Sequence, residues 1–114
     1  MARYTYSFTV AVSMDRLRQL MKEVLQSCNL DLIYDQSDCM MAREQPGQVS
    51  LSKLVTVEVL FDRITASQTA TTMSIVIKND ELALMVDNHC HRVFESVKQT
   101  ILENRNWQIV EIVG

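Results

Sequence analysis

The sequence predicts an α+β domain: an antiparallel sheet of about five strands in the order β-α-β-β-β-β-α, with two helices packed on one face of the sheet. Three observations support this fold class. Several segments alternate apolar and polar side chains with the period of two that a half-buried strand requires. Two longer segments repeat apolar residues every three or four positions, as amphipathic helices do. Short polar turns separate consecutive strands, which favours antiparallel neighbours.

The chain begins with a strand and then a helix. Apolar and aromatic residues alternate with smaller or polar ones from Tyr4 to Val12. Ser13 then offers a side-chain oxygen to the free amides of a helix, and an apolar stripe continues at helical spacing from Met14 to Cys28. Asn29 follows, and asparagine tolerates the left-handed conformation that ends many helices. We therefore expect a helix from about Met14 to Cys28.

Four further strands are expected as two hairpins. Strand-like runs over residues 30–35 and 39–44 flank the polar tripeptide Gln36-Ser37-Asp38, which is typical of a tight turn. Pro46 and Gly47 then mark a loop, because proline fixes φ and glycine permits dihedrals that other residues avoid. Residues 55–61 and 72–77 alternate again around a turn rich in Thr and Ser. These two segments predict a second, longer hairpin.

The last part of the chain predicts a helix and a further apolar segment. A short helical turn is expected over Leu82–Val86, and a long helix from about Asp87 to Asn104. Its apolar stripe consists of Cys90, Val93, Phe94, Val97, Ile101 and Leu102. Residues 107–113 are mostly apolar and β-prone, so they form either a short C-terminal strand or an apolar tail.

Composition narrows the classes of protein. The 114 residues, 47% of them apolar, suit a single domain spanning 1–114 with one core. The net charge is −3 and the basic residues are scattered, so a nucleic-acid partner is not expected. The longest apolar run has five residues, too few for a membrane span, and no secretory signal is recognised. Three cysteines without C-x-x-C spacing are interpreted as free thiols in the core of a soluble, cytoplasmic protein.

One segment, Asp87–His91, concentrates residue types that bind zinc. On a helix, however, His89 and His91 point about 200° apart, so one helix cannot bring both to one ion. The simpler interpretation is the first turn of a helix, capped by Asp87 or Asn88. We expect no metal and no cofactor.

Other polar groups also receive structural interpretations. The carboxylates of Asp31, Asp35 and Asp38 lack the ligand spacing of a calcium loop and suit a solvated hairpin tip. Cys90 and His91 are neighbours on a helix and face apart, which argues against a catalytic dyad. With two glycines in the chain, no phosphate-binding loop is present. We expect that the protein is not an enzyme.

The C-terminal segment is the strongest functional indication. Its candidate interface residues are Trp107, Ile109, Val110 and Ile112. A β-prone, apolar segment at a chain end pairs with an exposed sheet edge, either its own or a partner's. The sequence leaves both pairings open.

Two functions from different classes follow. The first is a non-enzymatic protein-interaction or assembly/adaptor module, with a protein partner or a second copy of itself in a homodimer. The order of elements also resembles small helix-on-sheet domains of the helix-grip kind. That resemblance implies the alternative, a binder of a small apolar ligand in a cavity between the second helix and the sheet. Enzyme activity through residues 89–91 ranks third.

Overall fold

The computed structural model describes residues 1–81, 88–104 and 107–113. In chain order its elements are β1 (Ala2–Val10), α1 (Met14–Ser27), β2 (Leu30–Gln36), β3 (Cys39–Glu44), the 3-10 helix η1 (Leu51–Lys53), β4 (Thr56–Phe61), β5 (Thr71–Asn79), α2 (His89–Glu103) and β6 (Ile109–Val113). The predicted α+β class and order of elements are confirmed, and the C-terminal segment forms a short strand. The helical turn expected over Leu82–Val86 lies outside the described residues.

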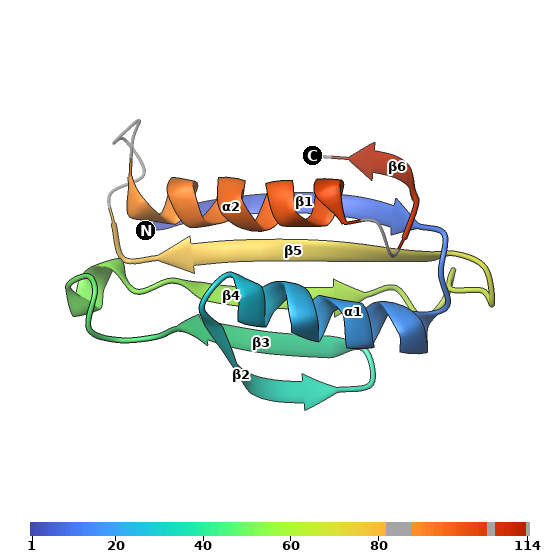
Figure 1. The fold of residues 1–114 in the computed structure, drawn as a ribbon, viewed down its shortest axis with the longest axis horizontal. Helices are drawn as coiled ribbons and strands as arrows, with labels where there is room; N and C mark the ends of the chain where they lie inside the picture. Colours follow the sequence, from blue (N-terminus) through green and yellow to red (C-terminus); the bar gives the residue numbers. More distant parts are fainter. Residues whose placement is uncertain (82–87, 105–106, 114) are drawn as a thin grey trace.

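The strands form one antiparallel sheet in the order β2-β3-β4-β5-β1-β6. Both helices lie on the same face of this sheet (Figure 1). Helix α2 packs on β1 and β5, and α1 lies over the half of the sheet that contains β2, β3 and β4. Neither helix, as far as the chain is described, is long and apolar enough to cross a bilayer.

Helix α1 begins and ends where the sequence predicts. Its N-cap is Ser13, whose side chain accepts a hydrogen bond from the backbone N of Arg16 at 3.4 Å. Asn29 adopts φ 62°, the left-handed conformation that turns the chain into β2. The buried stripe of the helix consists of Leu17, Leu20, Met21, Val24 and Leu25.

Helix α2 is capped by Asn88, whose side chain accepts a hydrogen bond from His91 N at 2.7 Å. The other predicted cap, Asp87, lies outside the described residues. The predicted stripe is buried at Cys90, Phe94, Val97 and Ile101. It is wrong for Leu102, which is exposed, because one helical step of about 100° past Ile101 turns this side chain away from the sheet.

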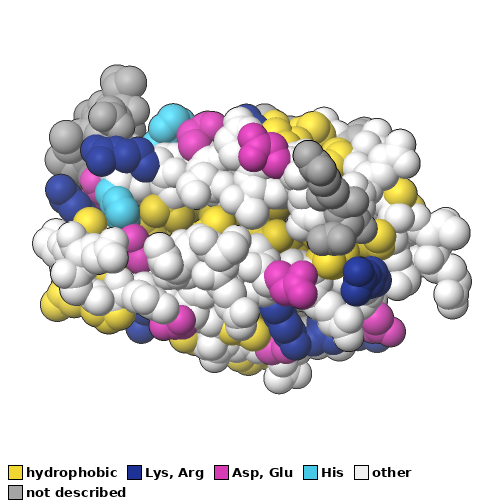
Figure 2. Space-filling view, in the orientation of Figure 1, with side chains coloured by type: hydrophobic (Ala, Val, Ile, Leu, Met, Phe, Trp, Pro, Cys, Tyr) yellow, Lys and Arg dark blue, Asp and Glu magenta, His cyan; other side chains and the backbone are white. Residues whose placement is uncertain are grey.

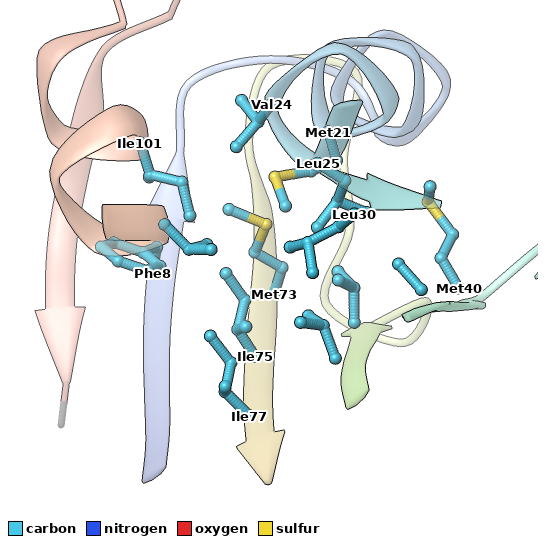
Figure 3. Packing of buried hydrophobic residues seen from close by; sticks show 14 of the residues in the cluster. Phe8, Met21, Val24, Leu25, Leu30, Met40, Met73, Ile75, Ile77 and Ile101 are labelled. Atoms are coloured by element: carbon cyan, nitrogen blue, oxygen red, sulfur yellow. The ribbon is translucent and has the colours of Figure 1, made fainter. Parts of the chain in front are cut away.

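Apolar side chains from both helices and from the inner face of the sheet form one continuous buried cluster (Figure 3). Met21, Met40 and Met73 are fully buried in it, as expected for thioethers that fill irregular gaps. Burial of one such side chain contributes about 1.5–3 kcal/mol. Cys90 belongs to the core, whereas Cys28 and Cys39 are half-exposed. The expectation that all three cysteines are core residues is therefore wrong for Cys39, whereas the half-exposed Cys28 still packs against the core.

The opposite face of the sheet carries no helix of the described chain, and polar contacts dominate it. The hydroxyls of Ser7 and Ser74 are 2.9 Å apart. Two residues further along β1, the hydroxyl of Thr9 lies at the same distance from that of Thr72. These contacts join β1 to β5 on the face away from the core. An outward side chain therefore alternates with a buried one along β1, which is the pattern that the sequence predicts.

Candidate functional site

The structure separates the four predicted interface residues into an inner and an outer pair. Trp107 is buried, and its Nε1 donates to the backbone O of Ile101 at 3.0 Å. Ile109 packs against the core. Val110 and Ile112 are exposed by 62% and 45%. The inner pair holds the C-terminal segment against the end of α2, and the outer pair remains on the surface.

Strand β6 pairs antiparallel with β1 of the same chain, in a register that places Ser7 opposite Val113 and Val10 opposite Ile109. The two pairings that the sequence left open are therefore reduced to one for this segment: it completes its own sheet. Because β6 is shorter than β1, it runs alongside the C-terminal part of β1 and no further (Figure 1).

The stretch Ala2–Tyr6 of β1 therefore has β5 on one side and no strand of residues 1–81, 88–104 or 107–113 on the other. We call this stretch the open edge. It is the first part of the candidate site, because an unpaired strand edge presents a row of backbone donors and acceptors to other chains.

The direction of the backbone groups along the open edge follows from two hydrogen bonds. Ala11 N donates to Gln108 O at 2.8 Å, on the β6 side of β1. Thr72 O accepts a hydrogen bond from Asp62 N at 2.9 Å, so the backbone groups of Thr72 in β5 face β4. The backbone groups of the residues directly before and after Thr72 therefore face β1. Since backbone groups alternate in direction along a strand, the odd-numbered residues of β1 face outward. The N–H and C=O groups of Arg3 and Thr5 thus point away from the sheet.

Aromatic side chains lie beside the open edge on the helix side. The ring of Tyr4 stacks on Phe94 with centroids 5.3 Å apart and meets the ring of His91 at 5.1 Å. The ring of Tyr6 meets Phe94 edge-on at 5.8 Å, and Lys98 Nζ lies 4.7 Å from the centroid of Tyr6. Both tyrosines are half-exposed. We call the rings of Tyr4, Tyr6, His91 and Phe94 the aromatic flank. This flank lies beside the open edge, where a pairing strand would cover it.

The two histidines of the Asp87–His91 segment diverge, as helical geometry predicts. His89 Nε2 lies 2.8 Å from both Oε1 and Oε2 of Glu44, and the two side chains are 18% and 13% exposed. His91 instead contacts Tyr4 and lies 3.6 Å from Glu95. Within the described parts of the chain, no three His, Cys, Asp or Glu side chains are grouped as metal ligands.

The thiol between the two histidines is inert. Cys90 is fully buried, and its Sγ lies 3.5 Å from the carbonyl O of Ile77. Burial, together with the carboxylates of Glu81 and Glu44, raises the pKa of Cys90 to about 11. A thiol with this pKa is protonated at neutral pH and is a poor nucleophile.

The three hairpin carboxylates do not converge. Asp35 forms ion pairs with Arg18 at 2.5 Å and Lys22 at 2.7 Å, both on helix α1. Asp31 accepts a hydrogen bond from Gln45, and Asp38 is exposed at the turn. The interpretation of all three as a solvated tip is wrong for Asp35, because α1 packs beside β2 and its Arg18 and Lys22 side chains reach this carboxylate.

Sequence reasoning did not identify the open edge, although one signal for it was present. The first strand segment is longer than the C-terminal strand that pairs with it, so part of its edge must remain uncovered. The aromatic flank also escaped notice, because Tyr4 and Tyr6 follow the same alternation as buried Phe8.

No protein-family model matches the sequence, and no curated protein matches it significantly. The function is therefore argued from the geometry of the site.

Proposed function

We propose that this protein is a non-enzymatic interaction module that forms a homodimer through the open edge of β1. The observation that carries the proposal is that β6 pairs with Ser7–Val10, while the edge of Ala2–Tyr6 opposite β5 has no strand beside it among the described residues. Edge strands of this kind either carry protective features or pair with another chain. Proline, a strand bulge and an inward-pointing charge are absent from Ala2–Tyr6, and the one charged side chain of this stretch is the exposed Arg3.

A second copy fits the open edge because the edge is complementary to itself. A two-fold axis at Tyr4 places Arg3 of one copy opposite Thr5 of the other, and both residues direct their backbone groups outward. Each such pair exchanges two N–H···O bonds in an antiparallel ladder. In each copy, β6 already occupies the edge of β1 from Ser7 onward. The two copies can therefore pair only along the open edge, which limits the register at both of its ends. The contact is isologous and closes as a dimer.

The same arrangement also covers the aromatic flank. Tyr4 of one copy lies opposite Tyr4 of the other at a position where side chains of antiparallel strands approach most closely. Cross-strand aromatic pairs of this kind contribute about 0.2–1 kcal/mol each. The pairing therefore buries half-exposed rings as well as backbone groups, and both terms favour the dimer.

The geometry gives less support to an apolar ligand between α2 and the sheet. The space lined there by Tyr6, Phe8, Phe94 and Val97 has no room for a molecule the size of water. Side chains fill it, so a ligand would have to displace part of the core. Such displacement costs packing free energy at every contact that is lost.

Sedimentation velocity over a range of protein concentrations tests the proposal. Thr5→Pro removes the N–H that faces the open edge and leaves the β1–β5 hydrogen bonds intact, since proline is tolerated where its nitrogen faces outward. The matched control Thr5→Ala keeps this N–H and removes only an exposed side chain. We expect dimers for the unmodified protein and for Thr5→Ala, and monomers for Thr5→Pro, with unchanged circular dichroism spectra.

A further variant distinguishes the open edge from the C-terminal segment. Val110→Asp changes an exposed residue of β6. Because this residue lies outside the stretch that pairs between the two copies, the dimer should persist. A monomeric unmodified protein at all concentrations would overturn the proposal. Dissociation by Val110→Asp but not by Thr5→Pro would overturn it in favour of an interface on β6.

A further inference from the structure

We infer that the pocket between the end of α1, the loop after β3 and the first turns of α2 binds a small neutral carboxamide. The pocket has a volume of about 370 Å³, within the range of about 300–1,000 Å³ that is usual for small-molecule sites. In Figure 2, histidine, basic and acidic side chains gather at the left end of the molecule, beside hydrophobic atoms that are visible between the two helices. The residues that line the pocket belong neither to the open edge nor to the aromatic flank, so the site does not depend on the dimer.

Three segments build the pocket. Helix α2 contributes His89, Val93 and Ser96, which share one face of the helix because they recur at three- and four-residue spacing. Asn29 after α1 and Gln45 after β3 also line it. Val93 offers apolar surface, and the other four side chains carry hydrogen-bonding groups. The pocket therefore suits a ligand that has both an apolar part and a polar group.

Glu44 determines what His89 offers to a ligand. His89 Nε2 lies 2.8 Å from both carboxylate oxygens of Glu44, so Nε2 carries a proton and donates it to the carboxylate. In the neutral imidazole, Nδ1 is then a hydrogen-bond acceptor. Within the described parts of the chain Nδ1 has no hydrogen-bond partner, and it is not buried. This nitrogen selects a ligand that presents an N–H or O–H donor.

Asn29 supplies the complementary donor. Its side chain is exposed, and its amide makes no hydrogen bond within the described residues. An asparagine amide has two N–H donors and one oxygen acceptor. A primary carboxamide carries an N–H donor and a C=O acceptor on the same carbon, so it can donate to His89 Nδ1 while its oxygen accepts from Asn29. A carboxylate lacks the donor that the imidazole requires.

The charges of the pocket favour a neutral ligand. Glu44 lines the pocket and repels an anion, and both of its oxygens are already engaged by His89. Arg92 also lines the pocket and has an interaction of its own. Its charge opposes the entry of a cation and does not select an anion. The two opposite charges leave hydrogen bonding and apolar contact as the basis of recognition.

Titration of isotope-labelled protein with three related compounds, followed by ¹H–¹⁵N NMR at mildly alkaline pH, tests the inference. The compounds are benzamide, N,N-dimethylbenzamide, which keeps the ring and the carbonyl but has no N–H, and benzoate, which is charged and has no N–H. We expect benzamide to shift the amide signals of Asn29, Val93 and Ser96 in a saturable manner. The other two compounds should bind roughly tenfold more weakly or less, since they leave the acceptor of the imidazole unpaired.

Variants of the protein test the two polar contacts separately. His89→Gln keeps a side-chain N–H for Glu44 and removes the acceptor Nδ1, so benzamide affinity should fall by roughly tenfold. His91→Gln is the matched control, because His91 lies outside the pocket and contacts Tyr4; it should leave the affinity unchanged. Asn29→Gly removes the amide at a position whose φ of 62° glycine adopts readily, and it should also weaken binding.

Four outcomes would overturn the inference: no saturable shift with benzamide, equal binding of benzamide and N,N-dimethylbenzamide, tighter binding of benzoate, or an affinity for benzamide that His89→Gln leaves unchanged. The spectrum of each unliganded variant shows whether its fold is retained. Asn29→Gly then provides a second test of the same pocket, should His89→Gln disturb the fold.

Discussion

Asn88 Nδ2 donates a hydrogen bond to the hydroxyl of Tyr4 at 3.0 Å, although the two residues are 84 positions apart in the chain. The side-chain oxygen of the same asparagine accepts from His91 N at 2.7 Å and caps α2. Asn88 is 1% exposed. One buried amide therefore joins the start of α2 to the open edge of β1 and sets the position of the aromatic flank.

Tyr4→Phe should destabilise the protein. The substitution removes the hydroxyl and leaves the buried Asn88 amide without this acceptor, which costs about 1–2 kcal/mol of the free energy of unfolding. Tyr34→Phe is the matched control, because Tyr34 is exposed and its hydroxyl has no hydrogen bond within the described structure. Urea unfolding measures both variants. Equal stability of the two would show that the bond to Asn88 contributes nothing.

Asp35→Asn should lower stability near neutral pH and have little effect in acid. The hydrogen bond from Lys22 and the neighbouring Arg18 hold the pKa of Asp35 below its ordinary value of 3.8. A lowered pKa in the folded state means that the contribution is present above the ordinary pKa and is lost as the pH falls through the folded value. We expect a cost of about 0.5–1 kcal/mol near neutral pH.

The control for this experiment is Asp38→Asn, at an exposed position of the same hairpin. Urea unfolding at neutral pH and at a pH well below 3.8 should show a difference between the two variants that shrinks in acid. Added salt should shrink it at neutral pH as well, since the ion pairs are partly exposed. A difference that persists unchanged in acid would exclude the ion pairs as its source.

Cys90 should resist alkylation until the protein unfolds. It is fully buried, and its pKa of about 11 leaves almost no thiolate at mildly alkaline pH. Cys28 and Cys39 are half-exposed and should react first. Treatment with iodoacetamide, followed by mass spectrometry of the peptides, gives the order of modification. Early modification of Cys90 in folded protein would contradict the packing of α2 against β5.

Asn29 should tolerate glycine better than alanine. Its φ of 62° lies in the left-handed region, which costs residues with a Cβ roughly 1–2 kcal/mol and glycine almost nothing. We therefore expect Asn29→Gly to retain or raise the melting temperature and Asn29→Ala to lower it. Thermal unfolding of the two variants side by side provides the test. Identical melting temperatures would indicate that α1 ends in another conformation.

Local patterns in the sequence were sufficient to predict both α-helices and the strands β1 to β5, whereas η1 was not predicted and the segment of β6 was left as a strand or a tail. Alternation identifies β1, and the spacing from Leu17 to Leu25 identifies α1. Ser13 and Asn29 mark the ends of that helix. These features depend on the backbone conformation of a few neighbouring residues, so a single sequence contains the information.

The candidate sites depend on contacts between distant residues, and periodicity does not encode them. The sequence pointed to the C-terminal segment as an edge strand but left its partner open. The register of Ser7 opposite Val113, which leaves Ala2–Tyr6 as the open edge, is a contact between segments at the two ends of the chain.

His89 and Glu44, 45 positions apart, belong to elements whose separate patterns predict only a helix and a strand. The sequence by itself determined the elements and their order, because those follow from local conformation and from which face is apolar. Tertiary structure alone decided which polar groups meet and which strand edge stays open, because both depend on how the helices and the sheet fill a common core.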